Sequence, residues 1–188
     1  MHHNISIRPA ALTDVPTIHE IYSFHVQHGL ASWELTPPSL TELQTRMRNL
    51  LEQGYPYFVA EIDGCVAGYA YAGAYRTRPG YRYTVENSIY VHPHYQRRGL
   101  ARLLLVELIE ACEALGYRQM IAVIGDSGNR PSIKLHQELG FVHIGTLPSI
   151  GFKHGRWLDC VLMQRPLGDG DQRLPDDDSS DLRGSNGL

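Results

Sequence analysis

A basic, glycine-containing turn at residues 92–101 has the residue types and spacing of an anion site. It reads His-Pro-His-Tyr-Gln-Arg-Arg-Gly-Leu-Ala and lies between the apolar run 89–91 and a predicted helix over 100–115. The first N–H groups of a helix have no partner inside the helix, and the helix dipole attracts negative charge to that end. The turn therefore predicts a binding site for a pyrophosphate.

The residues of this turn have separate expected contributions. Gly99 keeps a Cβ out of the path of the phosphates, and Ala101 keeps the next turn small. The predicted phosphate-binding residues are Arg97, Arg98, Gly99, Leu100, Ala101 and Arg102. The alternative is an ordinary basic turn between a strand and a helix.

The elements that must position this turn follow from hydrophobic periodicity and turn residues. Helices are expected to begin at Thr13 or Asp14 and to span 40–53, 100–115 and 131–139. Strands are expected at 6–8, 57–62, 65–72, 85–91, 119–124, 141–144 and 157–164. The pattern predicts an α/β fold, with a mixed, mostly antiparallel central sheet, helices on both faces and a ligand at the strand ends.

Composition and charge limit the class of protein. The 188 residues are 43% hydrophobic and 20% charged, as in globular proteins, and no apolar run reaches the roughly 18 residues of a membrane span. Residues 168–188 carry six aspartates and two arginines, so the chain's formal charge of −3 divides into −4 there and +1 in residues 1–167. We therefore expect one domain over 1–167 and a disordered acidic tail over 168–188, with neither a nucleic-acid nor a membrane partner.

Three widely spaced cysteines argue against a disulfide framework and a zinc site, and they favour the reducing cytoplasm. Cys112 and Cys160 lie in apolar runs and are predicted to be small core residues. The histidines have no accompanying ligand set at metal-binding spacing, so no metal is predicted.

Together these segments resemble the GCN5-related N-acetyltransferase superfamily. Its signature [Gln/Arg]-x-x-Gly-x-[Gly/Ala] matches Gln96–Ala101, and its later asparagine and helix ending in Gly-Phe match Asn129 and Gly140-Phe141. Within the superfamily the chain is similar to the phosphinothricin and methionine sulfoximine acetyltransferase group, over roughly residues 5–167. The segments that carry this similarity are 67–73, 84–91, 122–125 and 151–159.

The resemblance implies acetyl-CoA as co-substrate and assigns contacts to it. Main-chain groups of Ile89, Tyr90 and Val91 would bind the pantetheine arm as an added strand would, and one N–H there would stabilise the oxyanion. Asn129 would also contact the arm. The alternatives are that Ile89 and Val91 are only core residues and that Asn129 is only a turn residue before a helix.

The resemblance also assigns catalytic residues. Glu86 matches the family's glutamate in Thr-Val-Glu and would deprotonate the substrate ammonium, with a pKa raised by desolvation. His136 stands where many members of the superfamily have a tyrosine that protonates the CoA thiolate, and an imidazolium could do the same. The alternatives are a solvated glutamate at a strand start and a histidine bonded to a carbonyl.

Substrate contacts are expected from an Arg- and Tyr-rich connection and an early loop. Arginines 76, 78 and 82 offer paired donors to a carboxylate or phosphinate, although a single arginine can equally be a solvated surface charge. The predicted substrate residues are Trp33, Gly73, Ala74, Tyr75, Arg76, Tyr83, Thr84, Val85 and Glu86.

The sequence thus predicts a cytoplasmic, acetyl-CoA-dependent N-acetyltransferase. Its substrate would be the α-amino group of a small glutamate-like amino acid, such as phosphinothricin or methionine sulfoximine, with herbicide resistance as one consequence. The resemblance implies a homodimer. Two alternatives stay open: the same fold acting on a peptide N-terminus or a polyamine, and a non-catalytic acyl-CoA-binding module, against which the intact Glu86 argues.

Overall fold

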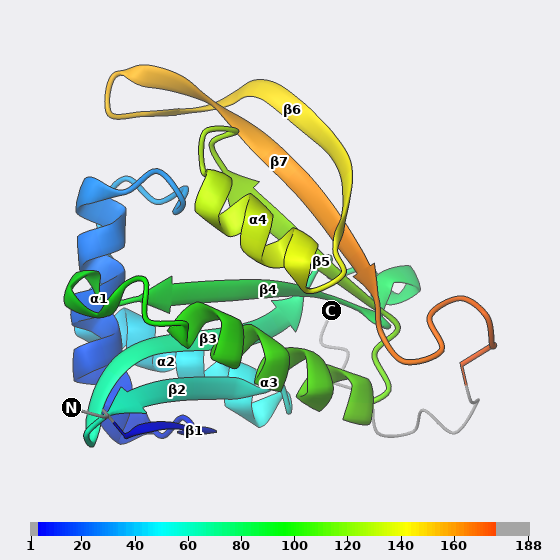
Figure 1. Ribbon diagram of the computed structural model, residues 1–188, viewed down its shortest axis with the longest axis horizontal. Helices are drawn as coiled ribbons and strands as arrows, with labels where there is room; N and C mark the ends of the chain where they lie inside the picture. Colours follow the sequence, from blue (N-terminus) through cyan, green and yellow to red (C-terminus); the bar gives the residue numbers. More distant parts are fainter. Residues whose placement is uncertain (1–3, 176–188) are drawn as a thin grey trace.

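A seven-stranded sheet in the order β1-β2-β3-β4-β5-β7-β6 organises the computed structural model, which describes residues 4–175 (Figure 1). The strands are β1 (Ile5–Pro9), β2 (Tyr57–Ile62), β3 (Cys65–Ala74), β4 (Thr84–Val91), β5 (Gln119–Gly125), β6 (Val142–Lys153) and β7 (Arg156–Pro166). The helices are α1 (Val15–His28), α2 (Leu40–Glu52), α3 (Leu100–Ala114) and α4 (Arg130–Glu138). Only β4 and β5 pair in parallel.

The predicted fold class is confirmed, because helices cover both faces of a mostly antiparallel sheet. In Figure 1, α3 and α4 lie in front of the sheet and α1 and α2 behind it. On α3, Leu104, Leu108 and Cys112 recur every four residues and are fully buried, which anchors that helix on the sheet. Cys160 is buried as well, and all three cysteines are free thiols, as predicted.

The last two strands are longer than the sequence predicted. They were expected at 141–144 and 157–164, whereas β6 and β7 form a hairpin that runs from Val142 to Pro166. Most of β6 is exposed, so its residues lack the alternation between buried and exposed positions that marks a strand in sequence. β7 ends at Pro166 and Leu167 is fully buried, whereas residues 176–188 of the predicted tail lie outside the described part of the chain.

The sheet separates between β4 and β5. Their pairing covers only Thr84–Glu86 on one strand and Gln119–Ile121 on the other, after which β5 continues beside β7. Figure 1 shows β5, β7 and β6 turning away from the line of β4. The second half of β4 is therefore paired on one side only, with β3.

The register of β4 shows which main-chain groups face this gap. Tyr75 N–H donates to Thr84 O, and His92 N–H donates to Ala67 O. Because hydrogen-bonded pairs alternate along an antiparallel ladder, the main chain of Tyr90 faces β3, whereas Ile89 and Val91 face the gap.

A loop between α1 and α2 covers one side of the gap and is held by close packing of its backbone and of the Trp33 ring on the sheet. A Cβ on Gly125 would lie 2.5 Å from Leu30 O, and one on Gly151 would lie 2.0 Å from Cζ3 of Trp33. The buried Lys153 donates from Nζ to Ser32 O at 2.8 Å. Two glycines and one lysine of the central and last strands thus fix this loop.

We predict that Gly125→Ala destabilises the protein by about 1–3 kcal/mol, because the new methyl group overlaps a backbone oxygen that cannot rotate away. Urea unfolding followed by circular dichroism measures the change. Gly145→Ala is the matched control, since Gly145 is also in the sheet and a Cβ there meets nothing within 4 Å. Equal stability of both variants would contradict close packing of the loop on β5.

Candidate active site

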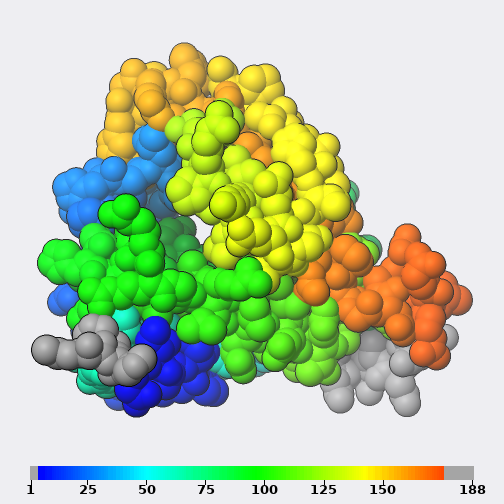
Figure 2. All heavy atoms as spheres, in the orientation of Figure 1, coloured from blue at the N-terminus to red at the C-terminus, as the bar shows by residue number. Residues whose placement is uncertain are grey.

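A cavity of about 350 Å³ occupies the gap between β4 and β5. The loop 31–34, β4, β5, the start of α3 and α4 all contribute to its wall. Figure 2 shows the surface hollowed where the green start of α3, the yellow-green α4 and the blue loop meet. Tyr22 of α1 also lines it, so six segments that are distant in sequence converge on the separated strands.

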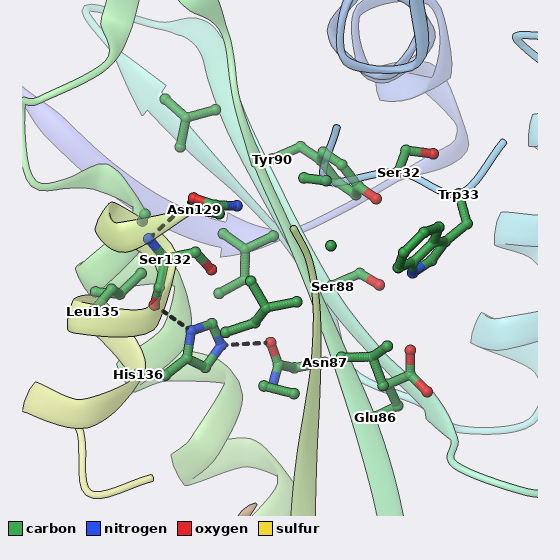
Figure 3. Close-up of a pocket in the computed structure, with 18 of the residues that line it drawn as sticks. Ser32, Trp33, Glu86, Asn87, Ser88, Tyr90, Asn129, Ser132, Leu135 and His136 are labelled. Atoms are coloured by element: carbon green, nitrogen blue, oxygen red, sulfur yellow. Dashed lines mark hydrogen bonds between the residues drawn. The ribbon is translucent and has the colours of Figure 1, made fainter. Parts of the chain in front are cut away.

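The cavity has two sides, one on each face of β4. Successive side chains of a strand point to opposite faces, so Glu86 and Ser88 point one way and Asn87 the other. In Figure 3, Glu86 lies with Trp33 on one side of β4, and His136 lies on the other side with Asn87. The gap is thus a passage at which two ligands approaching from opposite faces of the sheet can meet.

Glu86 lines the cavity as a half-buried carboxylate. Burial raises the pKa of Glu86 above its ordinary value, and the positive charge of Arg76 opposes part of that rise. A carboxylate with a raised pKa binds a proton more readily than an exposed one, which suits a general base.

His136 is buried and bonded at both ring nitrogens. Nδ1 donates to Ser132 O at 2.8 Å, and Nε2 lies 3.1 Å from Oδ1 of Asn87. The amide nitrogen of Asn87 donates to Ile121 O, which turns the amide oxygen toward the ring. Two oxygens around the ring favour its charged form, but burial is the larger effect and lowers the pKa of His136.

The turn that the sequence predicts to bind phosphate leaves free N–H groups at the start of α3. Gly99 has φ +83° and Arg97 φ +58°, and the first helical bonds of α3 run from Arg102 N–H and Leu103 N–H to Gly99 O. The N–H groups of Leu100 and Ala101 thus precede the first intrahelical bonds. Of the six predicted phosphate residues only Ala101 lines the cavity, while the buried Leu100 side chain packs in the core and Arg102 pairs with Glu138 at 3.6 Å.

The other cofactor residues from the sequence meet at the cavity. Ile89, Tyr90, Val91 and Asn129 all line it. Asn129 also caps α4, because its Oδ1 accepts from Ser132 N–H at 3.4 Å. The capping role and the cavity position occur together, so the two interpretations of this residue are compatible.

The predicted substrate residues are distributed more widely. Trp33 and Glu86 line the cavity, whereas Gly73 pairs with Glu86 across the ladder and Val85 is fully buried in the core. Arg76 lies over the ring of Tyr75 with 5.1 Å to its centroid. The remaining predicted residues, Ala74, Tyr83 and Thr84, lie at the ends of β3 and β4 and do not line the cavity.

Several residues of the site carried no signal in the sequence. Asn87 orients His136, and Tyr22 contacts Ser32 through a 3.1 Å hydroxyl–hydroxyl bond at the cavity wall. His25 of α1 donates from Nε2 to Val91 O at 2.8 Å, which leaves the Val91 N–H for a ligand. These contacts join residues 10–66 positions apart, and spacing alone does not reveal them.

Within residues 4–175, no group of three or more His, Cys, Asp or Glu side chains could hold a metal ion. The helices of the same region are too short or too polar to cross a membrane. The metal-free and membrane-free assignments stay predictions.

Comparison with known proteins identifies the family. The model of the acetyltransferase (GNAT) family matches residues 18–141, which is more than half of the chain. The chain therefore belongs to this acetyltransferase family, as its sequence motifs predicted.

Individual relatives narrow the similarity. The chain is 50% identical over 171 residues to a phosphinothricin N-acetyltransferase of Alcaligenes faecalis, covering 91% of this chain and 87% of that protein. It is 44% identical over 163 residues to an L-methionine sulfoximine/L-methionine sulfone acetyltransferase of Pseudomonas aeruginosa, covering 86% and 94%. A phosphinothricin acetyltransferase from Sinorhizobium meliloti, solved with acetyl-CoA, superposes with a TM-score of 0.90 at 47% identity, covering 93% and 94%.

We predict that His136 titrates below the ordinary histidine value of 6.5, because burial disfavours the imidazolium. NMR of the ring protons against pH measures the midpoint, with the urea-unfolded chain as reference and His136→Gln to assign the signal. A folded midpoint equal to or above the unfolded one would mean that the two oxygens around the ring outweigh burial.

Proposed function

We propose that the protein transfers the acetyl group of acetyl-CoA to the α-amino group of a small amino acid. The observation that carries this proposal is one arrangement: main-chain groups of β4 that face a gap in the sheet lie beside a half-buried carboxylate, Glu86. The first provides hydrogen bonds for an extended arm, and the second provides a base. Both line the same cavity.

The residues of the gap fit acetyl-CoA. Ile89 and Val91 would pair with the pantetheine arm, and the N–H groups of Leu100 and Ala101 at the start of α3 would hold the pyrophosphate. Arg97 and Arg98 add positive charge at that turn. Acetyl-CoA would supply a thioester whose carbonyl carbon accepts the amine.

Different groups of this chain have separate roles in the proposed reaction. Glu86 accepts a proton from the substrate ammonium, so that the nitrogen lone pair can attack. The N–H of Ile89, which of the two gap-facing residues lies nearer Glu86, stabilises negative charge on the carbonyl oxygen, while Val91, whose carbonyl His25 holds, pairs with the arm. His136 lies on the face opposite Glu86, where its charged form, the minor one at neutral pH because its pKa is lowered, or a water would donate a proton to the departing sulfur.

A small amino acid fits the other side of the gap. Ser32 and Trp33 of the loop line the same cavity of about 350 Å³ as Glu86, and a cavity of this size suits a small molecule better than a peptide or a polyamine. Arg76 acts electrostatically on Glu86 and is the candidate partner of the substrate carboxylate. The names of the relatives make phosphinothricin and methionine sulfoximine the model substrates.

The same proposal includes a cellular setting. Three free thiols fit a reducing cytoplasm, and acetylation of phosphinothricin would confer resistance to that herbicide.

A non-catalytic acyl-CoA-binding module is the second candidate, and Glu86 argues against it because such a module needs no half-buried base.

We predict that Glu86→Gln lowers kcat about 10²–10⁴-fold while acetyl-CoA binding is kept, because only the proton acceptor is lost. CoA release with methionine sulfoximine measures turnover, and calorimetry measures binding. Full turnover of the variant would contradict the base assignment.

The pH profile gives a second readout of the same group. Activity that needs the Glu86 carboxylate falls as the pH drops through the pKa of Glu86. The midpoint of this fall in activity therefore lies above pH 4.5, the ordinary pKa of a glutamate. Arg76→Gln removes a positive charge that favours the carboxylate form of Glu86, so it moves the midpoint of the fall in activity to still higher pH. A shift toward lower pH would contradict the assignment.

A homodimer is part of this proposal, with the β6–β7 hairpin as the contact surface. β6 is the edge strand of the sheet, and it exposes five large apolar side chains, at Val142, Ile144, Leu147, Ile150 and Phe152. Phe152 packs against the exposed Trp157 of β7 with ring centroids 5.2 Å apart. A long apolar edge of this kind is rare on a monomer, because it promotes aggregation unless it is covered.

We predict that the 21.2 kDa chain has twice that mass in solution and that Phe152→Lys shifts it to the monomer. Light scattering after gel filtration measures the mass. Ile5→Lys is the control, since Ile5 is exposed on β1, at the opposite edge of the sheet from β6. A dimer unaffected by Phe152→Lys would place the interface elsewhere.

A further inference from the structure

The β6–β7 hairpin contacts two loops that line the active-site cavity. Lys153 and Arg156 are paired residues on either side of the hairpin turn at 154–155. In Figure 1 this turn lies at the same end of the molecule as the loop that follows α1 and the loop that joins β5 to α4. These loops contribute Trp33 and Asn129, respectively, to the cavity wall.

Lys153 holds the loop that follows α1. Its side chain is 2% exposed, and its Nζ donates to Ser32 O at 2.8 Å. A buried ammonium is costly unless it is hydrogen-bonded, so this amine and the Ser32 carbonyl fix each other. Gly151 lies on the same face of β6 two residues earlier, and a Cβ there would overlap the ring of Trp33. Lys153 and Gly151 together therefore set the position of Trp33.

Arg156 and Asp159 hold the loop between β5 and α4. The guanidinium of Arg156 donates to Oδ2 of Asp126 at 2.6 Å, and the Ser127 hydroxyl donates to Oδ2 of Asp159 at 2.6 Å. The N–H of Asp126 also donates to Asp159 O. Asp126 has φ +66°, a left-handed conformation that residues with a side chain rarely adopt. The contacts from β7 hold Asp126 in that conformation.

The conformation of Asp126 in turn sets the position of Asn129. The carbonyl of Asp126 accepts from Asn129 N–H at 3.0 Å, and its side chain accepts from Gly128 N–H at 3.3 Å. Asn129 then begins α4 as its capping residue. The hairpin therefore reaches the cavity wall on this side through Asp126.

The two loops lie on different sides of the gap. In Figure 3, Trp33 lies with Glu86 on one side of β4, and Asn129 lies with His136 on the other. In the proposed reaction the amino acid occupies the Glu86 side, and acetyl-CoA approaches from the other. Each loop therefore belongs to one of the two ligands.

We propose that the hairpin positions the two ligands through separate residues: Lys153 acts on the amino acid, whereas Arg156 and Asp159 act on acetyl-CoA. None of these three side chains lines the cavity, so each acts through the loop that it contacts. They are positioning residues, and Glu86 remains the proposed base. This inference rests on the proposed N-acetyltransferase function.

The first test is Lys153→Met. It raises the KM for methionine sulfoximine about tenfold, because a hydrogen bond from a charged group no longer fixes the loop with Trp33. The Kd for acetyl-CoA, measured by calorimetry, and kcat change less than about twofold, since neither Glu86 nor the other loop is altered. Gly151→Ala keeps the buried amine and displaces the Trp33 ring, so it raises the same KM even if Lys153→Met does not fold. Lys134→Met on the surface of α4 is the matched control and changes none of these quantities.

The second test is Asp159→Ala, which has the opposite pattern. It raises the Kd for acetyl-CoA about fivefold through loss of a charged acceptor, while the KM for methionine sulfoximine at saturating acetyl-CoA is kept. Ser127→Ala removes the same contact from the loop and gives the same shift. Arg156→Gln and Asp126→Asn weaken acetyl-CoA binding without additivity, because they remove one shared contact. Asp171→Ala, exposed beyond β7, is the control.

A merely structural role of the hairpin would change the binding of both ligands together. Equal effects of Lys153→Met and Asp159→Ala on both ligands, or no effect on either, would therefore overturn the inference. A wild type that binds acetyl-CoA but acetylates no amino acid would instead overturn the proposed function. In that case an unchanged Kd for acetyl-CoA in Asp159→Ala would still overturn the inference as well.

Discussion

The active site depends on one constraint, which is the short pairing between β4 and β5. Three residues of each strand pair, and then the strands separate while both continue. Main-chain N–H and C=O groups in a protein interior need partners, so the second half of β4 has donors and acceptors to offer to something other than a strand. His25 takes one of these acceptors, at Val91, and the remaining groups at Ile89 and Val91 face the cavity.

The rest of the fold makes this opening rigid and places charge around it. Side chains of β4 pack in the core on both faces of the sheet, which holds the strand in its position. The covering loop is held by Gly125, Gly151 and Lys153 instead of by its own secondary structure. Glu86 and His136 then lie on opposite sides of β4, which keeps the proposed base apart from the proposed proton donor.

Much of the fold was predictable because its signals are local. Apolar periodicity located α3, and the Gly99 turn identified the phosphate end of the site, where a positive φ requires a residue such as glycine. The β6–β7 hairpin was predicted too short because β6 is exposed along most of its length, so burial does not alternate along it. Asn87 and His25 could not be predicted as site residues, since each depends on contacts between segments that only the folded sheet brings together.

The central claim is that the main chain of Ile89 and Val91 binds acetyl-CoA through its N–H groups. Amide hydrogen exchange, followed residue by residue with NMR before and after addition of acetyl-CoA, tests it most directly. The account predicts that exchange slows strongly at Ile89 and Val91, while Tyr90, whose N–H already faces β3, changes little. Saturating acetyl-CoA that leaves the exchange at Ile89 and Val91 unchanged would contradict it.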